Sequence, residues 1–206
     1  MKDNMKPELI LEQMETLGNI HRENFRDIDR SIREGFNALE LESLHRVITL
    51  GDGDSYHAAL STEMAFGAFS KVAYYPTPAY QFLAYDSYHI PFNFPRDTLV
   101  VGISASGGSS KVVESVKKAR NVSEKVMVAG LVGNVDSRVA EAAGRLLSTQ
   151  LPELGRSPGI RTYTASLMGL FSLAIRIGEI KRIYHMNEAN RLRQEIIDMA
   201  DDVDDT

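Results

Sequence analysis

Apolar side chains recur every three or four residues between Glu8 and about Leu44, with charged side chains between them. This spacing predicts amphipathic helices, and Gly18 is a candidate break between two of them. The charged positions on the opposite face allow two interpretations. They form either a solvated surface stabilised by pairs one helical turn apart, or a surface that grips a second subunit.

Strand and helix patterns alternate in the next part of the chain. Apolar runs too short for helices predict five strands, at Val47–Leu50, Lys71–Tyr75, Thr98–Ile103, Val126–Leu131 and Leu146–Ser148. Helical segments lie between most of them, and such crossovers join parallel strands. We therefore predict an α/β fold, with a five-stranded parallel sheet that is doubly wound in three α/β/α layers and preceded by N-terminal helices.

The length of 206 residues suits one main hydrophobic core. We divide the chain into N-terminal helices at 1–43, an α/β domain at 44–184, and a C-terminal helix with an acidic tail at 185–206. The α/β domain ends in a predicted long helix from Arg161 to about Tyr184.

Composition narrows the classes of partner and chemistry. A formal net charge of −5 argues against nucleic acids and anionic membranes as partners. The absence of cysteine excludes disulfides, thiolate metal sites and a cysteine nucleophile, and it fits the reducing cytoplasm where we expect the protein. The longest apolar stretch, Leu167–Ile175, is far shorter than a membrane span. Nothing in the sequence indicates a metal or another cofactor.

The third predicted strand runs into a loop that is rich in hydroxyl groups and glycine, followed by a helix. Its candidate ligand-binding residues are Ser104, Ala105, Ser106, Gly107 and Ser109. Glycine lets backbone N–H groups approach a ligand, and the helix presents unpaired N–H groups and a positive dipole end, so the loop is suited to phosphate. Neither the Walker nor the Rossmann glycine pattern is present. The alternative is a simple tight turn with Ser109 as helix N-cap.

These residues resemble a known family. Ile103-Ser-Ala-Ser-Gly-Gly-Ser109 is similar to the Ser-x-Ser-Gly-x-Thr/Ser signature of the SIS (sugar isomerase) family, and Gly51-Asp-Gly-Asp-Ser-Tyr-His-Ala58 is similar to the family's first turn, particularly in the isomerase part of glucosamine-fructose-6-phosphate aminotransferases. The resemblance covers roughly Leu44 to Ile180 and implies that residues 44–184 bind a sugar phosphate. It adds Gly53, Asp54 and Ser55 as ligand-binding candidates.

Asp54 departs from the family, whose members usually have a small hydroxyl residue or glycine there. A carboxylate repels phosphate, so three interpretations stay open. Asp54 caps the following helix, accepts hydrogen bonds from sugar hydroxyls, or marks a site that has lost phosphate binding.

A loop before the long helix matches the place where the family closes over its ligand. Arg156 and Arg161 are candidates for a phosphate clamp, or are solvated arginines at a helix start. An aldose–ketose isomerase needs a base that moves a proton through an enediol, and our catalytic candidates are Glu153 and His57.

We expect a phosphosugar isomerase that a partner subunit completes, in a homodimer or homotetramer formed through the N-terminal helices. The alternatives are a sugar-phosphate-binding or regulatory module without chemistry, and the first half of a longer two-copy enzyme.

Overall fold

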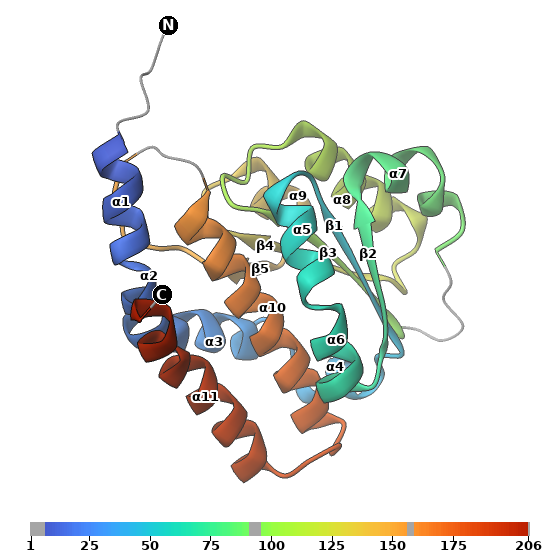
Figure 1. Ribbon diagram of the computed structural model, residues 1–206. Coiled ribbons are helices and arrows are strands. Elements are labelled where there is room, and N and C mark those ends of the chain that lie inside the picture. Colours follow the sequence, from blue (N-terminus) through green and yellow to red (C-terminus); the bar gives the residue numbers. More distant parts are fainter. Residues whose placement is uncertain (1–6, 91–95, 156–158, 206) are drawn as a thin grey trace, which may run out of the picture.

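A computed structural model describes residues 7–90, 96–155 and 159–205. It contains a five-stranded, fully parallel sheet in the order β2-β1-β3-β4-β5, with helices on both faces (Figure 1). The strands are β1 (Arg46–Gly51), β2 (Ala73–Pro78), β3 (Thr98–Ser104), β4 (Met127–Val132) and β5 (Leu146–Ser148). The predicted doubly wound α/β fold is confirmed.

The central strand β3 is buried along its whole length. Leu99, Val101 and Ile103 point into one core cluster, and Val100 points into another on the opposite face. Successive side chains of a strand alternate between the two faces, so a continuous apolar run is what a sheet covered on both sides requires. The pattern predicted from the sequence therefore has its physical cause in the two layers of helices.

Each face of the sheet has its own helices. On one face lie α5 (Asp54–Ser61) and α10 (Ile160–Ile180), and on the other lie α7 (Ala79–Ala84), α8 (Ser110–Val122) and α9 (Arg138–Ala143). Short helical segments α6 (Glu63–Ala65), η2 (Phe66–Ser70) and η3 (Asp86–Tyr88) complete the connections. Both crossover layers leave the carboxyl ends of the strands free to carry loops.

The second strand is displaced from its predicted position. We predicted Lys71–Tyr75, whereas β2 begins at Ala73 and runs on to Pro78. Lys71 has a left-handed conformation, with φ of 55°, and ends the helical segment η2. The strand can include Pro76 and Pro78 because it lies at the edge of the sheet, where a missing N–H group breaks no ladder.

The predicted N-terminal helices are present as a series of segments: α1 (Pro7–Glu15), α2 (Leu17–Asn19), the π-helical η1 (Ile20–Asn24), α3 (Phe25–Glu34) and α4 (Ala38–Glu42). Gly18 lies inside α2, and a Cβ built on it would be 2.1 Å from the Asp204 carboxylate of α11 (Met186–Asp204). Gly18 therefore gives α11 room to pack closely, and the helical break falls just before it, at Thr16.

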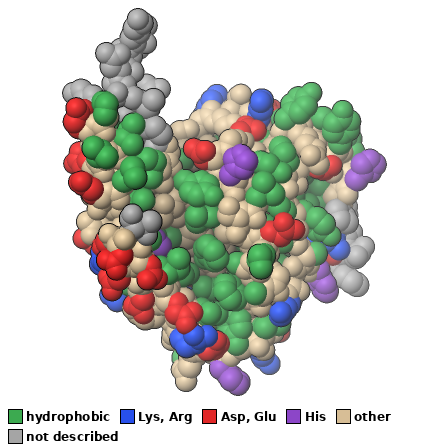
Figure 2. Space-filling model, in the orientation of Figure 1, with side chains coloured by type: hydrophobic (Ala, Val, Ile, Leu, Met, Phe, Trp, Pro, Cys, Tyr) green, Lys and Arg blue, Asp and Glu red, His purple; other side chains and the backbone are tan. Residues whose placement is uncertain are grey.

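A third apolar cluster joins the N-terminal helices to the last two. Phe25 and Ile28 of α3 are in one cluster with Met168 of α10 and Ile196 of α11. Figure 2 shows acidic side chains gathered on the side of the molecule that carries α1 and α11. No helix in the described ranges is long and apolar enough to cross a membrane.

One charged position of α3 differs from our expectation. Asp29 belongs to the charged face that we expected either to be solvated or to grip a second subunit, but only 7% of it is exposed. Its carboxylate accepts hydrogen bonds from Ser172 Oγ of α10 at 2.6 Å and from Arg193 Nε of α11 at 3.0 Å. The carboxylate is buried because α11 folds back over α3 and supplies a buried guanidinium as its partner.

Candidate functional site

The loops that follow β1 and β3 lie side by side at the carboxyl edge of the sheet. Leu50 of β1 is in register with Gly102 of β3, so the two strands end together. Beyond them the Ser109 hydroxyl donates a hydrogen bond of 2.9 Å to Oδ2 of Asp52. The β1–α5 loop (residues 52–53) and the β3–α8 loop (residues 105–109) thus form one polar surface.

The β3–α8 loop is a tight turn that caps a helix. Gly107 N donates to Ser104 O at 3.0 Å, and the Ser109 hydroxyl accepts from Val112 N at 3.4 Å as N-cap of α8. Ser106 is exposed, and its hydroxyl accepts from Gly108 N at 3.3 Å. Ser109 thus caps α8, while its role in binding a ligand stays a prediction, and its proton is directed at the neighbouring loop.

Gly107 is required in this turn for two reasons. Its φ is +63°, a left-handed conformation that other residues adopt only at a cost. A Cβ at this position would also lie 2.0 Å from the hydroxyl oxygen of Ser137, which caps α9. Ser104 is buried at the end of β3, while Ala105 at the start of the loop is partly exposed.

The start of α8 adds positive partial charge to this polar surface. This helix has 13 residues, and N–H groups of a first helical turn have no partner within the helix. The macrodipole places about half a positive charge at this end. The guanidinium of Arg138 is also close and donates a hydrogen bond to Gly108 O. These features favour an anion next to Ser109.

The β1–α5 loop is shaped by glycine, and one carboxylate lies in it, at Asp52, and another directly after it, at Asp54. Gly53, with φ of +52°, is the N-cap of α5, so Asp54 lies in the first turn and does not cap the helix as one of our interpretations had it. Ser55 N donates to Asp52 O at 3.2 Å. A Cβ built on Gly159 would lie 3.1 Å from Oδ2 of Asp54, so this carboxylate reaches the start of α10.

A cavity of about 430 Å³ lies beside Ala105, the first residue of the β3–α8 loop, but neither Ser106, Ser109 nor any residue of the β1–α5 loop is among its described lining residues. Ala105, Glu153 and Arg161 line it, so three of the predicted residues lie around one space. The other described lining residues are Gln13, Gly133, Asn134, Thr149, Leu151, Pro152, Leu154, Gly155, Gly159 and Thr162. We call this space the loop cavity.

The two catalytic candidates have different surroundings. Glu153 is exposed on the segment before α10 and lines the loop cavity. His57 is exposed on α5, with its ring 5.7 Å from that of Tyr56, and it is not among the described residues that line the cavity. Within the described ranges, no group of three or more acidic or histidine side chains could hold a metal ion.

Arg161 makes a hydrogen bond to the segment that precedes its own helix. Its Nη1 donates to Pro152 O at 3.1 Å, and its Nε is buried without a hydrogen-bond partner among the described residues. The guanidinium therefore holds the segment before α10 against the helix start while facing the loop cavity. Arg156, the other half of the predicted clamp, lies outside the described residues.

Sequence reasoning missed two residues of this region. Asp52 stands in the quoted first-turn motif, but only the fold shows that its carboxylate accepts a hydrogen bond from the Ser109 hydroxyl. Gln13 of α1 is buried and lines the loop cavity. Its amphipathic helix gave no indication that one polar side chain turns inward toward loops more than ninety residues away.

Comparison with known proteins identifies relatives of the whole architecture. Over 173 residues, 84% of this chain, it is 28% identical to glutamine–fructose-6-phosphate aminotransferase (isomerizing) of Thermococcus kodakarensis, and it spans 27% of that enzyme. The C-terminal domain of glucosamine-fructose-6-phosphate aminotransferase from Francisella tularensis superposes with a TM-score of 0.72 and 15% identity, covering 98% of this chain and 55% of the other. A candidate phosphosugar isomerase from Clostridium difficile 630 superposes with a TM-score of 0.76 and 19% identity, covering 93% and 52%.

The chain thus spans about a quarter of this curated relative and about half of these two solved chains. The model of the SIS domain family matches residues 40–176, which include the whole sheet and both glycine-bearing loops. Since this match covers more than half of the chain, the protein belongs to the SIS domain family.

Proposed function

We propose that the chain binds a phosphorylated sugar at the carboxyl edge of the sheet and acts as an aldose–ketose isomerase that a partner subunit completes. The observation that carries this proposal is the hydrogen bond from Ser109 to Asp52, because it brings the two loops with family motifs into one surface. The function of the named relatives supports the same class of ligand.

The phosphate is placed at the start of α8 in this proposal. Ser104 and Ser106 supply hydroxyl groups, and Ser109 turns its hydroxyl proton from Asp52 to the phosphate when the ligand binds. The first turn of α8 supplies N–H groups and the positive dipole end. Hydrogen bonds to a charged oxygen are worth about 1.5–3 kcal/mol each, so a few of them are enough for a micromolar to millimolar ligand. The other predicted binding residues let the backbone approach the phosphate, and they are Gly53, Ser55, Ala105 and Gly107.

In this proposal Asp54 binds the hydroxyl groups of the sugar. Its carboxylate is exposed at the rim and reaches the start of α10, so it can accept hydrogen bonds from sugar hydroxyls between the two segments. Arg161 orders the loop on the other side of the same space and offers its positive charge to the ligand.

Glu153 is the proposed base. It removes the proton from C2 of an open-chain aldose phosphate while O1 gains a proton, which gives the enediol. Returning the proton to C1 while O2 loses its proton gives the ketose, so no oxidant or other reactant is consumed. Glu153 is exposed in the isolated chain, whereas a base of this kind works best when partly desolvated. A covering surface from a second subunit, in a dimer or tetramer formed through the N-terminal helices, would supply that desolvation.

A binding module without chemistry is the second candidate. His57, the other catalytic candidate, is exposed and does not line the loop cavity, which leaves ring opening without an assigned group among the described residues. A phosphosugar sensor needs the serine loops but not Glu153.

The experiment that separates the two candidates uses the full chain with fructose 6-phosphate. Calorimetry measures binding, and NMR in D2O follows formation of the aldose phosphate and the entry of deuterium at C1 of the ketose and at C2 of the aldose. An isomerase binds and exchanges, whereas a module binds without exchange. Absence of binding contradicts both, and native mass spectrometry of the same sample gives the number of subunits.

A further inference from the structure

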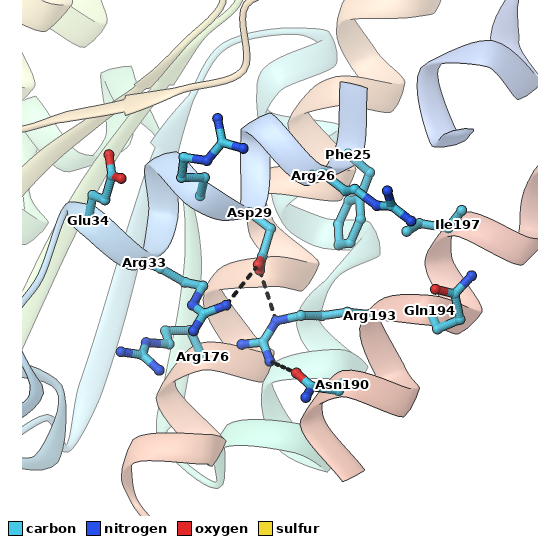
Figure 3. Close-up of a pocket in the computed structure, with 11 residues that line it drawn as sticks. Phe25, Arg26, Asp29, Arg33, Glu34, Arg176, Asn190, Arg193, Gln194 and Ile197 are labelled. Carbon is cyan, nitrogen blue, oxygen red and sulfur yellow. Dashed lines mark hydrogen bonds and ion pairs between the residues drawn. The ribbon is translucent and has the colours of Figure 1, made fainter. Parts of the chain in front are cut away.

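A second groove, of about 600 Å³, lies between α3, α10 and α11. Five arginines and two carboxylates are among its lining residues, in a chain whose net charge is −5. The arginines are Arg26, Arg30, Arg33, Arg176 and Arg193, and we call this space the arginine groove (Figure 3). None of its lining residues lines the loop cavity.

The floor of the arginine groove is a fixed ion network. Arg193 donates to Asp29 at 3.0 Å, to Asn190 at 3.3 Å and to Glu179 at 2.7 Å, and only 8% of its side chain is exposed. Arg176 donates to Glu179 at 2.9 Å. One oxygen of the Asp29 carboxylate is therefore hydrogen-bonded by Arg193 and Ser172, and its other oxygen lies 3.9 Å from Nη1 of Arg33.

The mouth holds three arginines on one stripe of α3. Arg26, Arg30 and Arg33 are four and three residues apart, so they follow one another along a single helix face. Arg30 pairs with the exposed Asp27, and Arg33 comes only within 3.9 Å of Asp29. Arg26 makes no ion pair or hydrogen bond with a described residue. Like charges at this spacing repel, and an anion in the groove would relieve the repulsion.

The stripe has a definite length. Arg33 lies seven positions after Arg26, which corresponds to about 10 Å along the helix. This span exceeds one phosphate group and suits two or three linked ones. Arg176 adds a further donor, since its Nε is buried and has no hydrogen-bond partner among the described residues. Phe25 and Ile197 supply apolar surface beside the amide of Gln194.

We propose that the arginine groove binds a phosphoanhydride, either the linked phosphates of a nucleoside di- or triphosphate or inorganic pyrophosphate. Guanidinium groups bind phosphate oxygens in a bidentate manner, which lysine cannot do. The volume lies in the range of sites for small molecules, and this favours a compact ligand over an acidic segment of another protein.

The test is calorimetry on the full chain with inorganic pyrophosphate and with ADP in metal-free buffer. We expect saturable binding of one ligand per chain, weakened at least tenfold in the Arg26→Gln/Arg33→Gln variant. The matched control is Arg191→Gln, because Arg191 is an exposed arginine of α11 that pairs with Glu188 and Glu195 outside the groove. Ser104→Ala/Ser106→Ala should leave pyrophosphate binding unchanged, which keeps the groove separate from the serine loops.

Each outcome decides the proposal. Tighter binding of ADP than of pyrophosphate supports a nucleotide, and equal binding supports recognition of the phosphates alone. No binding overturns the proposal, as does binding that the serine variant loses and the arginine variant keeps. Arginine-dependent binding of an aspartate-rich peptide, without binding of either small ligand, overturns it too and identifies a protein-docking surface. Both mouth arginines replaced here are exposed, so we expect the variants to fold. Circular dichroism checks this.

Discussion

Ser109 and Asp52 are joined by a hydrogen bond of 2.9 Å that spans 57 positions of the chain. The same Ser109 hydroxyl accepts from Val112 N and so caps α8. The hydroxyl oxygen of Ser109 therefore has a structural role as the cap of α8 and a proposed role in ligand binding. The first prediction separates these two roles.

Ser109→Ala should weaken affinity for fructose 6-phosphate at least tenfold and lower the free energy of unfolding by about 1 kcal/mol through loss of the cap. Asn37→Ala is the matched control, because Asn37 caps α4 in a capping box far from the loops. It should lose similar stability and keep full affinity. Calorimetry and urea unfolding measure the two quantities, and equal affinity of both variants would contradict the site.

Asp52→Asn should strengthen sugar-phosphate binding several-fold. The amide oxygen still accepts the hydrogen bond from Ser109, while the charge that repels a phosphate dianion is removed. Raising the salt concentration should reduce the gain, since salt screens charge repulsion. Titrations of the two proteins at low and high salt check this, and weaker binding of the variant would place the phosphate elsewhere.

Ser104→Ala with Ser106→Ala should weaken affinity for sugar phosphate at least tenfold with folding intact. Among the described residues, the Ser106 hydroxyl bonds only to the backbone of its own loop, and neither replacement adds volume. Calorimetry with fructose 6-phosphate, beside a thermal melt of each protein, gives the result. Unchanged binding would remove these serines from the site.

Glu153→Gln should abolish the entry of deuterium at C1 of the ketose and at C2 of the aldose, while affinity changes less than threefold. The amide has nearly the same shape but cannot accept the proton from C2. Glu141→Gln, at an exposed position of α9, is the control for loss of a surface carboxylate. Full exchange in the Glu153 variant would exclude it as the base.

Stability should fall in acid through Glu40. Its carboxylate accepts bonds of 2.8 and 3.0 Å from Arg145, which hold the pKa of Glu40 below its ordinary value of 4.5. Because the pKa is lower in the folded chain, the stabilisation is complete above pH 4.5 and is lost as the pH falls from there through the folded-state value. Arg145→Gln should lower stability at neutral pH and flatten this dependence, whereas Arg191→Gln should leave it unchanged. Urea unfolding across the acid range measures both.

Gly107→Ala should destabilise the fold by at least about 1–3 kcal/mol, because the residue has a positive φ and faces the Ser137 side chain. Gly67→Ala is the control, since a Cβ there would meet no atom within 4 Å. It should be neutral or slightly stabilising. Denaturant unfolding of the pair checks the difference.

The sequence was sufficient for the parts of the fold that rest on local pattern. The run from Leu99 to Ile103 predicted a strand covered on both faces, and the structure confirms it. The β2 boundary was wrong because prolines usually end strands, and only the strand order shows that Pro76 and Pro78 lie at an edge.

Contacts between distant segments could not be predicted in this way. Asp29 has the same local pattern as a surface residue, and its buried partner Arg193 is 164 positions away. Gln13 likewise turns inward because of loops that meet it only in the folded chain. For the site, the motifs located the loops correctly, while the assignment of Glu153, His57 and Arg161 to chemical roles stays a prediction.

The prolines of β2 also bear on how copies of the chain can meet. A bare sheet edge offers N–H and C=O groups to a strand from another molecule, which leads to open-ended stacking. Pro76 and Pro78 remove two such donors from one border of the sheet, and the strand at the opposite border, β5, has three residues. The sheet is thus poorly suited to grow by strand addition, so ordered self-association is left to the helical surfaces.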